Sequence, residues 1–405
     1  MKKDNYDIVI IGAGLAGVTC ALTASRQSGL KIALVERETI GSNKSVPLTF
    51  ADVTDENDLL DCIKGRYSSF AFHNYRGSKI EYVFSDHPLV VLDYQKACSK
   101  IFQNISRVEN RFEYIIGYAK RIYSVGKDLC VPVSDERNLT AKIVIDCTGG
   151  NSTANDEEVI ASRYFSHPFG AIFSGVQLIR DKIAYFLLPN NEFGNGGGWF
   201  YPLEDNRVSF GYATISNSIT LDVAEVRRKF FRAVNEFEPY CHILKSAKLE
   251  SIDRGIIPIT YKKNLTRQNI MYVGDAAGMA TNWTCMGVEP AIKYGKLAGM
   301  LSATAILQKD ISVLNSLQII WNRDNKNIYD AMNRYASTFW ANGHYVWEWI
   351  INNDLAYLSP VKLLHRLRNN GHLIKKHQLF YRAIKYKYSK LMKSGPDKTR
   401  EIIIQ

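Results

Sequence analysis

The stretch Tyr6-Asp-Ile-Val-Ile-Ile-Gly-Ala-Gly-Leu-Ala-Gly17 decides the fold of this 405-residue chain. Its apolar run at residues 8–11 is typical of a buried strand, and three glycines follow with the spacing GxGxxG. In this spacing Gly12 permits a tight turn, Gly14 lets the backbone approach a pyrophosphate, and Gly17 lets a helix pack closely on a strand. The stretch therefore predicts a strand, a phosphate-binding turn and a helix, in that order.

The residues after the glycines complete a βαβ unit. Residues 18–25 have helical composition, and a second apolar strand at residues 31–35 ends at Glu36, where an acidic side chain can bind a ribose. A GxGxxG stretch alone is a weak signal, and the alternative is a glycine-rich turn without a ligand. The whole unit instead predicts that a dinucleotide binds with its phosphates at the N-terminus of the helix. We expect the following residues to bind it: Gly12, Ala13, Gly14, Leu15, Ala16, Gly17, Glu36 and Arg37.

Two later stretches resemble signatures of the glutathione-reductase-type flavoproteins. In residues 270–278 a short strand leads into Gly274-Asp275 and then into small residues that can open another helix. In those flavoproteins the aspartate binds the ribityl chain and the helix start faces the flavin, where its positive end stabilises the reduced ring. Residues 141–150 resemble the strand and the Thr-Gly turn of the same proteins. For Gly274-Asp275 taken alone, the alternative is an ordinary turn.

The order of these three signatures along the chain implies non-covalent FAD as the cofactor. The resemblance adds the following residues to the expected cofactor site: Thr148, Gly149, Gly274, Asp275, Ala276, Gly287 and Val288. The chain has no second dinucleotide fingerprint, because the glycines at 194–198 lie between two strand-like runs and not at a strand-to-helix turn. We therefore expect NADPH or another electron donor to bind only transiently.

Composition excludes several classes of protein. With 46% hydrophobic and 22% charged residues, the chain can bury a large core and is not disordered. Its seven cysteines form no CxxC or Cys/His cluster, so we expect no metal site and a reduced, cytoplasmic environment. Cys147 and Cys285 lie near the flavin signatures, where they are either redox-active or small buried residues. We expect no targeting segment and, without a run of 18 apolar residues, no transmembrane helix.

The expected fold class is α/β, or α+β overall: a Rossmann-type FAD-binding domain of the glutathione-reductase type, a discontinuous antiparallel-sheet substrate domain and a helical C-terminal extension. The expected bounds are 1–45, 90–160 and 255–305 for the FAD domain, 46–89 and 161–254 for the substrate domain, and 306–405 for the C-terminal region. Short aromatic and β-branched runs predict antiparallel strands at residues 169–179, 183–188, 197–202 and 207–214. Apolar residues with helical spacing predict a helix at residues 221–237.

Within the substrate domain, the stretch Asn195-Gly-Gly-Gly-Trp-Phe-Tyr-Pro202 resembles the geranylgeranyl reductase family. That family carries a Tyr-x-Trp-x-Phe-Pro signature before a charged turn and a glycine-containing strand. Trp199 and Pro202 match this signature, whereas Tyr201 replaces the Phe and Gly197 stands at the first Tyr. The related Trp-x-Trp-x-Ile-Pro signature of flavin-dependent halogenases fits less well, since Gly197 removes one Trp and Tyr201 replaces the Ile. The resemblance covers residues 1–300.

The resemblance implies that aromatic residues line an apolar substrate cavity beside the flavin. The expected lining residues are Trp199, Tyr201, Pro202 and Trp283. The alternative is that Trp199 and Tyr201 are core aromatics of a sheet. The chain departs from the family in having no Cys at residues 41–50, and Tyr94 stands where related flavoproteins commonly have an Arg.

The implied function is FAD-dependent reduction of a C=C bond in an isoprenoid-like or other hydrophobic small molecule. In that reaction the reduced flavin gives a hydride to one carbon and an acid protonates the other, and the candidate acids are Tyr201, Cys285 and Glu289. The alternative is an FAD-dependent monooxygenase or halogenase of an aromatic metabolite. A halogenase would need a lysine in the cavity, for which Lys44 and Lys79 are available. An RNA-modifying flavoprotein is the third hypothesis.

The tail of the chain differs in charge from the rest. Residues 361–405 hold twelve Lys or Arg against Asp397 and Glu401, and they account for most of the net charge of +11. Aromatic and apolar residues interleave with these charges, as in segments that bind an anionic membrane surface. We therefore expect a cytoplasmic protein that is peripheral on the inner face of the membrane. The alternatives are a solvated helical tail that covers the core and an RNA-binding segment, of which nucleic acid is the less favoured partner. The oligomeric state stays open.

Overall fold

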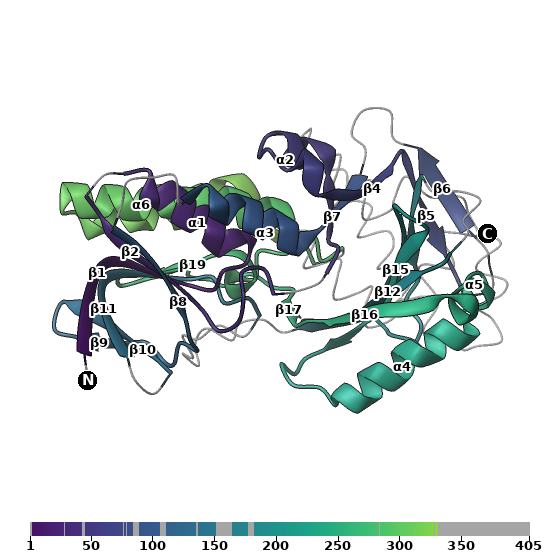
Figure 1. Cartoon of the computed structure of the whole chain (residues 1–405). Helices are drawn as coiled ribbons and strands as arrows, with labels where there is room; N and C mark the ends of the chain where they lie inside the picture. The colour runs from purple at the N-terminus through teal and green to yellow at the C-terminus, as the bar shows by residue number, and fades with distance from the viewer. Residues whose placement is uncertain are drawn as a thin grey trace.

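The computed structural model describes residues 2–27, 29–42, 45–75, 77, 79–83, 89–105, 111–134, 137–150, 164–176, 182–282, 284–327 and 329–330. Trp283, Lys44 and the basic tail at 361–405 lie outside these residues. Within the described part, two large sheets and one small sheet form the body of the molecule (Figure 1). No described helix is both long and apolar enough to cross a membrane.

The first large sheet contains the glycine stretch. Its main strands lie in the order β8-β2-β1-β11-β19, and each neighbouring pair in this order is parallel. The strands of this sheet are β1 (Lys2–Ile11), β2 (Lys31–Glu36), β8 (Arg111–Ile116), β9 (Tyr123–Val125), β10 (Asp128–Val133), β11 (Arg137–Asp146), β18 (Thr266–Arg267) and β19 (Ile270–Tyr272). The helices α1 (Leu15–Ser25), α3 (Tyr94–Gln103) and α6 (Val288–Gln308) lie together on one face (Figure 1). The predicted order of strand, turn, helix and strand is confirmed.

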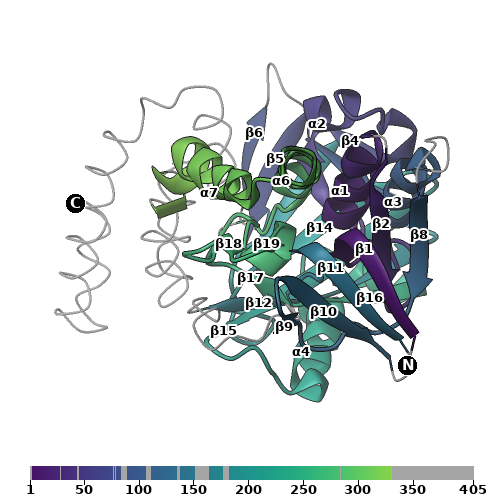
Figure 2. The same ribbon diagram turned by 90° about the vertical axis from the view of Figure 1, so that its left-hand side faces the viewer.

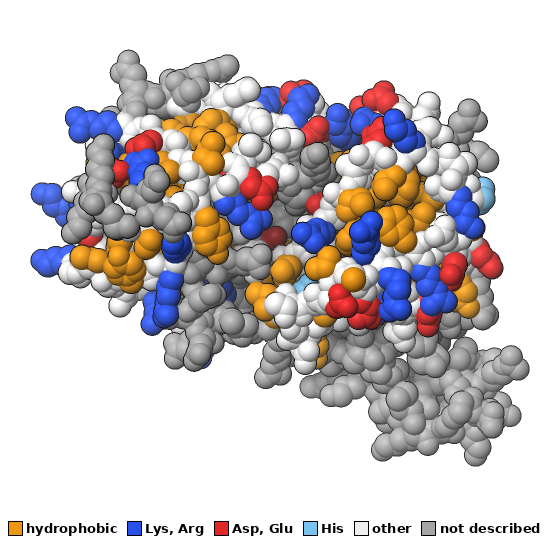
Figure 3. All heavy atoms as spheres, turned by 60° about the horizontal axis from the view of Figure 1, so that its bottom comes forward, with side chains coloured by type: hydrophobic (Ala, Val, Ile, Leu, Met, Phe, Trp, Pro, Cys, Tyr) orange, Lys and Arg blue, Asp and Glu red, His pale blue; other side chains and the backbone are white. Residues whose placement is uncertain are grey.

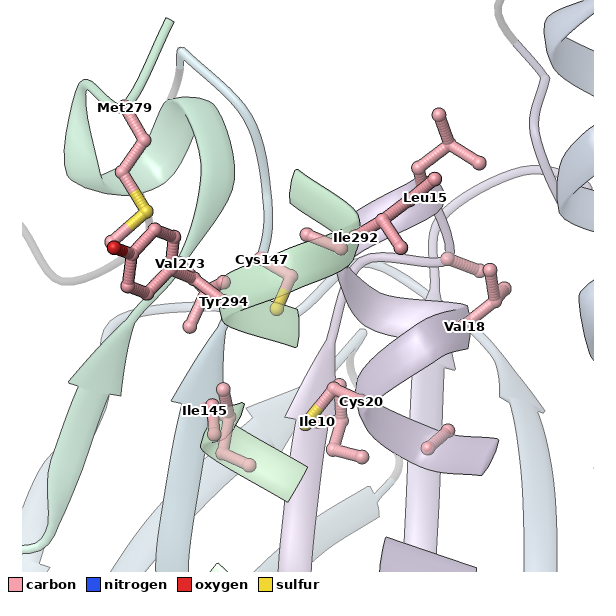
Figure 4. Packing of buried hydrophobic residues seen from close by; sticks show 14 of the residues in the cluster. Ile10, Leu15, Val18, Cys20, Ile145, Cys147, Val273, Met279, Ile292 and Tyr294 are labelled. Atoms are coloured by element: carbon pink, nitrogen blue, oxygen red, sulfur yellow. The ribbon is translucent and has the colours of Figure 1, made fainter. Parts of the chain in front are cut away.

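Close packing of α1 against α6 on the same face of the sheet explains the small residues in both helices. A Cβ atom added to Gly295 of α6 would lie 2.6 Å from the carbonyl oxygen of Ala16, and one added to Gly299 would lie 2.4 Å from that of Cys20. The two helix backbones therefore approach more closely than larger residues would allow. Figure 4 shows the core that results, with side chains of β1, α1, β11 and α6 packed together.

The second large sheet lies beside the first. Its strand order is β16-β12-β15-β14-β13-β5-β6, and β17 also pairs with β12. The strands are β5 (Ser69–His73), β6 (Lys79–Val83), β12 (Phe165–Ser174), β13 (Ile183–Leu187), β14 (Gly198–Leu203), β15 (Arg207–Ser216), β16 (Lys248–Arg254) and β17 (Ile257–Pro258). All pairs are antiparallel except β13 with β5. The helices α4 (Val223–Glu236) and α5 (Cys241–Ser246) follow β15 in the chain, and α4 packs on β12 and β15.

Most predicted strands of this region agree with the structure to within two residues, and so does the helix at 221–237. The exception is the strand predicted at 169–179, which begins at Phe165 and ends at Ser174. Gly175 follows with a φ of +76°, a backbone conformation that favours glycine and ends the strand. Residues 177–179 lie outside the described part of the chain.

Several smaller elements complete the described part of the chain. The remaining elements are β3 (Leu48–Phe50), β4 (Ile63–Tyr67), β7 (Leu89–Leu92), α2 (Ala51–Asp55), α7 (Ser316–Trp321), the 3₁₀ helices Leu60–Cys62, Gly274–Ala277 and Ile311–Asn315, and a π-helical turn at Asn322–Lys326. The strands β3, β7 and β4 form the small sheet. Helix α7 lies beside β18 and β19 (Figure 2), where the Leu265 N–H donates a hydrogen bond to Gln318 Oε1 at 2.7 Å.

The segment after Asp275 differs from the expected helix. It forms a short 3₁₀ turn that ends at Gly278, whose φ is +67°, and the long helix α6 begins only at Val288. A Cβ atom at residue 278 would lie 2.2 Å from the carbonyl oxygen of Thr260. Because this neighbouring backbone runs so close, the chain turns away here and does not continue as a helix.

Candidate active site

A cleft of about 1090 Å³ lies between the two large sheets. Residues from the nucleotide motif and from the aromatic stretch line the same cleft. The sequence-predicted residues that line it are Gly14, Leu15, Ala16, Arg37, Thr148, Gly149, Trp199, Tyr201, Gly274, Asp275, Cys285, Gly287 and Val288. The other described candidates, Gly12, Ala13, Gly17, Glu36, Pro202, Ala276 and Glu289, do not line it. The structure thus separates residues that can touch a ligand from those that can only support the site.

The first and third glycines shape the turn from beneath. Gly12 has a φ of +97°, and its N–H donates a hydrogen bond to the carbonyl oxygen of Val35 at 2.7 Å. A Cβ atom at Gly17 would lie 1.8 Å from the carbonyl oxygen of Gly12. Neither position tolerates a side chain, and the turn therefore presents Gly14 and the start of α1 to the cleft.

Glu36 holds the same turn from the end of β2. Its Oε2 accepts a hydrogen bond from the N–H of Ala13 at 2.7 Å, and its Oε1 accepts one from the N–H of Glu38 at 3.1 Å. Arg37, next to it, is exposed and forms an ion pair with Glu38 at 3.5 Å. From the end of β2, this carboxylate thus holds the glycine turn that follows β1.

Tyr94 lies on the side of the cleft that the glycine turn and the start of α1 form, which we call the nucleotide wall. None of the sequence motifs includes this residue. Its hydroxyl accepts a hydrogen bond from the N–H of Leu15 at 3.2 Å, and a Cβ atom at Gly14 would lie 2.6 Å from the same oxygen. Tyr94 also lines the cleft. Its only signal in the sequence was that it replaces the Arg common in related flavoproteins.

Asp275 and Gly287 meet at the inner end of the nucleotide wall. The carboxylate of Asp275 lines the cleft, and no described residue gives it a hydrogen bond. Burial raises the pKa of this carboxyl to about 6. A Cβ atom at Gly287, directly before α6, would lie 3.2 Å from Asp275 Oδ1. The small residue keeps the helix start close to the carboxylate.

Trp199 forms the opposite wall, and two glycines hold it flat. A Cβ atom at Gly170 or at Gly211 would lie 2.5 or 2.2 Å from Cζ2 of the indole, respectively. The indole Nε1 donates a hydrogen bond to Ser209 Oγ at 3.0 Å. The ring therefore lies across β12 and β15 on the cleft side of the sheet. Sequence reasoning missed both glycines because they become neighbours of Trp199 only when the strands pair.

Tyr201 follows on the same side of β14. Its ring packs against Phe186 with centroids 6.0 Å apart and against Tyr67 with centroids 6.2 Å apart. Burial raises the pKa of its hydroxyl, and no hydrogen bond joins this hydroxyl to another described residue. The carbonyl oxygen of the next residue, Pro202, accepts a hydrogen bond from the Tyr67 hydroxyl at 2.6 Å, and Pro202 does not line the cleft. Tyr201 thus presents a protonated hydroxyl group within an otherwise apolar wall.

The two other candidate acids differ in position. Cys285 lines the cleft in a strained backbone conformation with a φ of +52°, and burial raises the pKa of its thiol to about 11. Glu289 lies in the first turn of α6 and is not among the described residues that line the cleft. Only Tyr201 and Cys285 therefore meet at the site.

Asp253 on β16 is a further cleft carboxyl that sequence reasoning missed. It pairs with Gly170, the glycine beneath Trp199, and burial raises its pKa from 3.8 to about 6. Of the described residues that line the cleft, none is a lysine. The described residues also contain no cluster of three His, Cys, Asp or Glu side chains that could hold a metal ion.

The nucleotide wall fits a dinucleotide flavin on its geometry. Gly14, Leu15 and Ala16 at the first turn of α1 line the cleft, where backbone N–H groups can bind an anionic pyrophosphate, although that of Leu15 also donates to the Tyr94 hydroxyl. The carboxylate of Asp275 has no described hydrogen-bond donor and faces the same space. Both features leave polar groups for a ligand to satisfy.

Comparison with known proteins agrees with this geometry. A model of the pyridine nucleotide-disulphide oxidoreductase family matches residues 6–163. Digeranylgeranylglycerophospholipid reductase 3 of Methanosphaera stadtmanae is 29% identical over 343 residues, which are 77% of this chain and 81% of the relative. A digeranylgeranylglycerophospholipid reductase of Methanococcus vannielii is 22% identical over 401 residues, 91% of this chain and 89% of that protein.

Solved structures show the same fold. A geranylgeranyl bacteriochlorophyll reductase-like protein of Thermoplasma acidophilum superposes with a TM-score of 0.78 at 16% identity, covering 93% of this chain and 99% of that one. The flavin-dependent brominase Bmp2 superposes with a TM-score of 0.69 at 15% identity, covering 95% and 99%. With the cleft geometry, the family model and the relatives in sequence identify the chain as an FAD-dependent oxidoreductase that is similar to the geranylgeranyl reductase-like flavoproteins.

Proposed function

We propose that this protein reduces C=C bonds in the isoprenoid chain of an apolar lipid. The observation that carries the proposal is the cleft itself, in which a nucleotide wall faces an aromatic wall. The relatives named digeranylgeranylglycerophospholipid reductases support a lipid with geranylgeranyl chains as the substrate. When bound and reduced, FAD supplies the hydride for such a reaction.

The nucleotide wall would bind FAD in the manner of the glutathione-reductase type. Backbone N–H groups at Gly14 to Ala16 would receive the pyrophosphate, and the hydroxyl of Tyr94 would donate a hydrogen bond to it. Glu36 would hold the glycine turn from beneath, and Asp275 would bind the ribityl chain. The start of α6 at Gly287 and Val288 would place the positive end of a helix toward the ring.

The aromatic wall would bind the substrate chain. The indole of Trp199, held over two glycines, gives a flat apolar surface, and Phe72 and Phe186 line the same cleft. Aromatic walls of this kind exclude water and bind planar unsaturated chains. Tyr201 places one polar group within this surface.

Two side chains can hold the proton that the second carbon needs. Tyr201 and Cys285 both line the cleft, and burial raises the pKa of both groups, so that both stay protonated at neutral pH. The hydroxyl of Tyr201 is the better placed of the two, because no described group competes for its proton. We assign Tyr201 Oη as the proton donor and Cys285 Sγ as its neighbour in the cleft.

The electron donor would bind transiently at the cleft, as NADPH or another carrier. The glycines at 194–198 support this part of the proposal, because they lie between two strands, at the start of β14, and not at a strand-to-helix turn. A monooxygenase or halogenase is the second function, supported by the shared fold of the brominase Bmp2. Against a halogenase stands the absence of a lysine from the described cleft lining, since Lys79 lies elsewhere on β6.

The test is product analysis. Purified protein, chemically reduced under anaerobic conditions, is incubated with a digeranylgeranylglycerophospholipid, and the lipid is examined by mass spectrometry. We expect stepwise gain of two hydrogens per reduced bond. Tyr201→Phe should slow the gain by about tenfold to a thousandfold, the range of a general acid, while FAD content is kept. Unchanged lipid with fully reduced flavin would contradict the proposal.

A further inference from the structure

Apolar side chains are exposed where the cleft opens between α4 and β16. Val223, at the start of α4, is 48% exposed, and Ile252 and Leu249 on β16 are 41% and 40% exposed. Val223 and Ile252 also line the cleft. Figure 3, which views the molecule toward its lower side, shows orange side chains gathered among blue ones on the half that holds this region. We call residues 219–231 and 248–254 the α4–β16 face.

The exposed apolar residues extend a core that lies beneath α4. Leu249 pairs with Phe173, and Ile252 pairs with Ala171, and both partners belong to that core. Val223 stands two helical turns before Phe230, which is buried in the same core. The apolar stripe therefore continues past the edge strand β16, where the described residues no longer cover it. Apolar area exposed next to a ligand cleft is typical of an interaction surface.

Two of the acidic groups of this face form ion pairs. Glu225 pairs with Lys229 at 3.1 Å, and Glu250 pairs with Arg207 at 4.0 Å, whereas Asp222 caps α4 by accepting a hydrogen bond from the Ala224 N–H. Asp253 lies on the other side of β16, because it pairs with Gly170 on the cleft side of the sheet.

Cations of the same face remain without such partners. No ion pair joins the following side chains to any acidic residue that the structure describes: Arg227, Arg228, Lys248 and Arg254. Arg254 also lines the cleft, and Arg227 lies over the ring of Phe231 at 5.6 Å. The face thus combines exposed apolar residues with four cations that pair with no carboxylate of the described residues.

We propose that the α4–β16 face docks on an anionic lipid bilayer. Apolar side chains would enter the interface while the four cations meet lipid phosphates, an arrangement that binds proteins to acidic membranes. Because Val223, Ile252 and Arg254 also line the cleft, a lipid chain would pass from the bilayer around the edge strand β16 to Trp199. The purpose of docking rests on the proposed function, whereas the docking itself does not. The face is distinct from the basic tail.

Hydrogen exchange of the full chain tests the proposal and separates this face from the tail. Exchange is measured by mass spectrometry without vesicles, with phosphatidylcholine vesicles, and with equimolar phosphatidylcholine–phosphatidylglycerol vesicles. We expect slower exchange at 219–231 and 248–254 with the mixed vesicles only, and a loss of this protection at high salt. The double variant Arg228→Gln with Lys248→Gln should weaken the vesicle affinity of the face by about tenfold or more.

A matched control lies on the hairpin of β9. Tyr123 and Val125 are 47% and 44% exposed there, and Arg121 and Lys127 lie beside them. The double variant Arg121→Gln with Lys127→Gln should leave the protection of the α4–β16 face unchanged. Protection confined to this hairpin or to 361–405 would overturn the proposal, as would a face that exchanges slowly without vesicles because the chain or a second copy covers it. Docking without lipid reduction would contradict the proposed function alone.

Discussion

The two walls of the cleft are built in different ways. The nucleotide wall consists of backbone and small residues, with Gly14 and Gly274 at turns that follow parallel strands. The aromatic wall consists of large side chains on an antiparallel sheet, with Trp199 and Tyr201 on β14. Backbone N–H groups at a turn and at a helix start favour an anionic ligand, so the nucleotide wall is specific for an anion. The side-chain wall can change its substrate without disturbing the cofactor.

The largest effect on the nucleotide wall is expected from a change at Gly14. The change Gly14→Val places a Cβ atom 2.6 Å from the Tyr94 hydroxyl and methyl groups at the pyrophosphate position, so we expect FAD binding to be abolished. Flavin released by heat is identified by chromatography, and its absorbance per protein is compared with the wild type. The control is Gly255→Ala, whose Cβ atom would meet only Pro168 Cγ, at 3.7 Å. Bound FAD in the Gly14 variant, or FMN in the wild type, would refute the assigned nucleotide wall.

The pH dependence of stability tests the environment of Asp253, which pairs with Gly170 beneath the aromatic wall. The native pKa of its carboxyl is about 6 against 3.8 in the unfolded chain, so the native state binds this proton more tightly. Stability should therefore fall as pH rises from about 4 to about 6, by up to about 3 kcal/mol from this group. Asp253→Asn should remove that loss and be more stable than the wild type at pH 7, but not at pH 4.

Denaturant unfolding at a series of pH values measures this effect. The control is Asp205→Asn, because Asp205 is exposed and is not among the residues that line the cleft. An equal shift in both variants would mean that the environment of Asp253 is not the cause.

A double-mutant cycle tests the glycine platform of Trp199. Gly211→Ala should destabilise the protein by about 1–3 kcal/mol, because its Cβ atom would lie 2.2 Å from the indole. In the Trp199→Ala background the same change should cost close to nothing, since all three nearest atoms belong to Trp199. Thermal unfolding and FAD content are recorded together. A cost that is independent of Trp199 would show that the glycine serves the sheet and not the indole.

Tyr94→Phe is the mildest change to the nucleotide wall. It removes the hydroxyl that accepts a hydrogen bond from the Leu15 N–H, and we expect FAD affinity to fall by about 1 kcal/mol. Titration of the flavin-free protein with FAD measures the loss, with Tyr118→Phe as an exposed control. Tighter binding in the Tyr94 variant would mean that the hydroxyl competes with the pyrophosphate.

The parts of the fold that could be predicted are those that local backbone rules decide. The turn at Gly12 to Gly17 needs positive φ and close approach, so its glycines are readable in sequence. By contrast, the contacts of Trp199 with Gly170 and Gly211 join strands that are paired only in the fold. The delayed start of α6 depends on a backbone approach near Thr260, which no sequence window of that region contains.

The candidate site shows the same division. Tyr201, Cys285 and Asp275 were readable because they lie in or beside motifs, and the structure places all three on the cleft. Asp253 carried no motif, because its burial arises from the edge strand β16 packing beside β12. Glu289 has the right chemistry in sequence but lies outside the described cleft lining. Spacing thus predicts which chemistry is present, whereas packing decides which groups meet.

The central claim is that reduced flavin in this cleft passes its electrons directly to an unsaturated lipid. The measurement is a single turnover: FAD-loaded protein is photoreduced without oxygen and mixed with a digeranylgeranylglycerophospholipid, and the oxidised flavin absorbance is followed. The account predicts anaerobic reoxidation, with one C=C bond reduced per flavin and slower reoxidation in Trp199→Ala. Flavin that stays reduced with the lipid and is reoxidised only when oxygen is admitted, with oxygen incorporated into an aromatic compound, would contradict it.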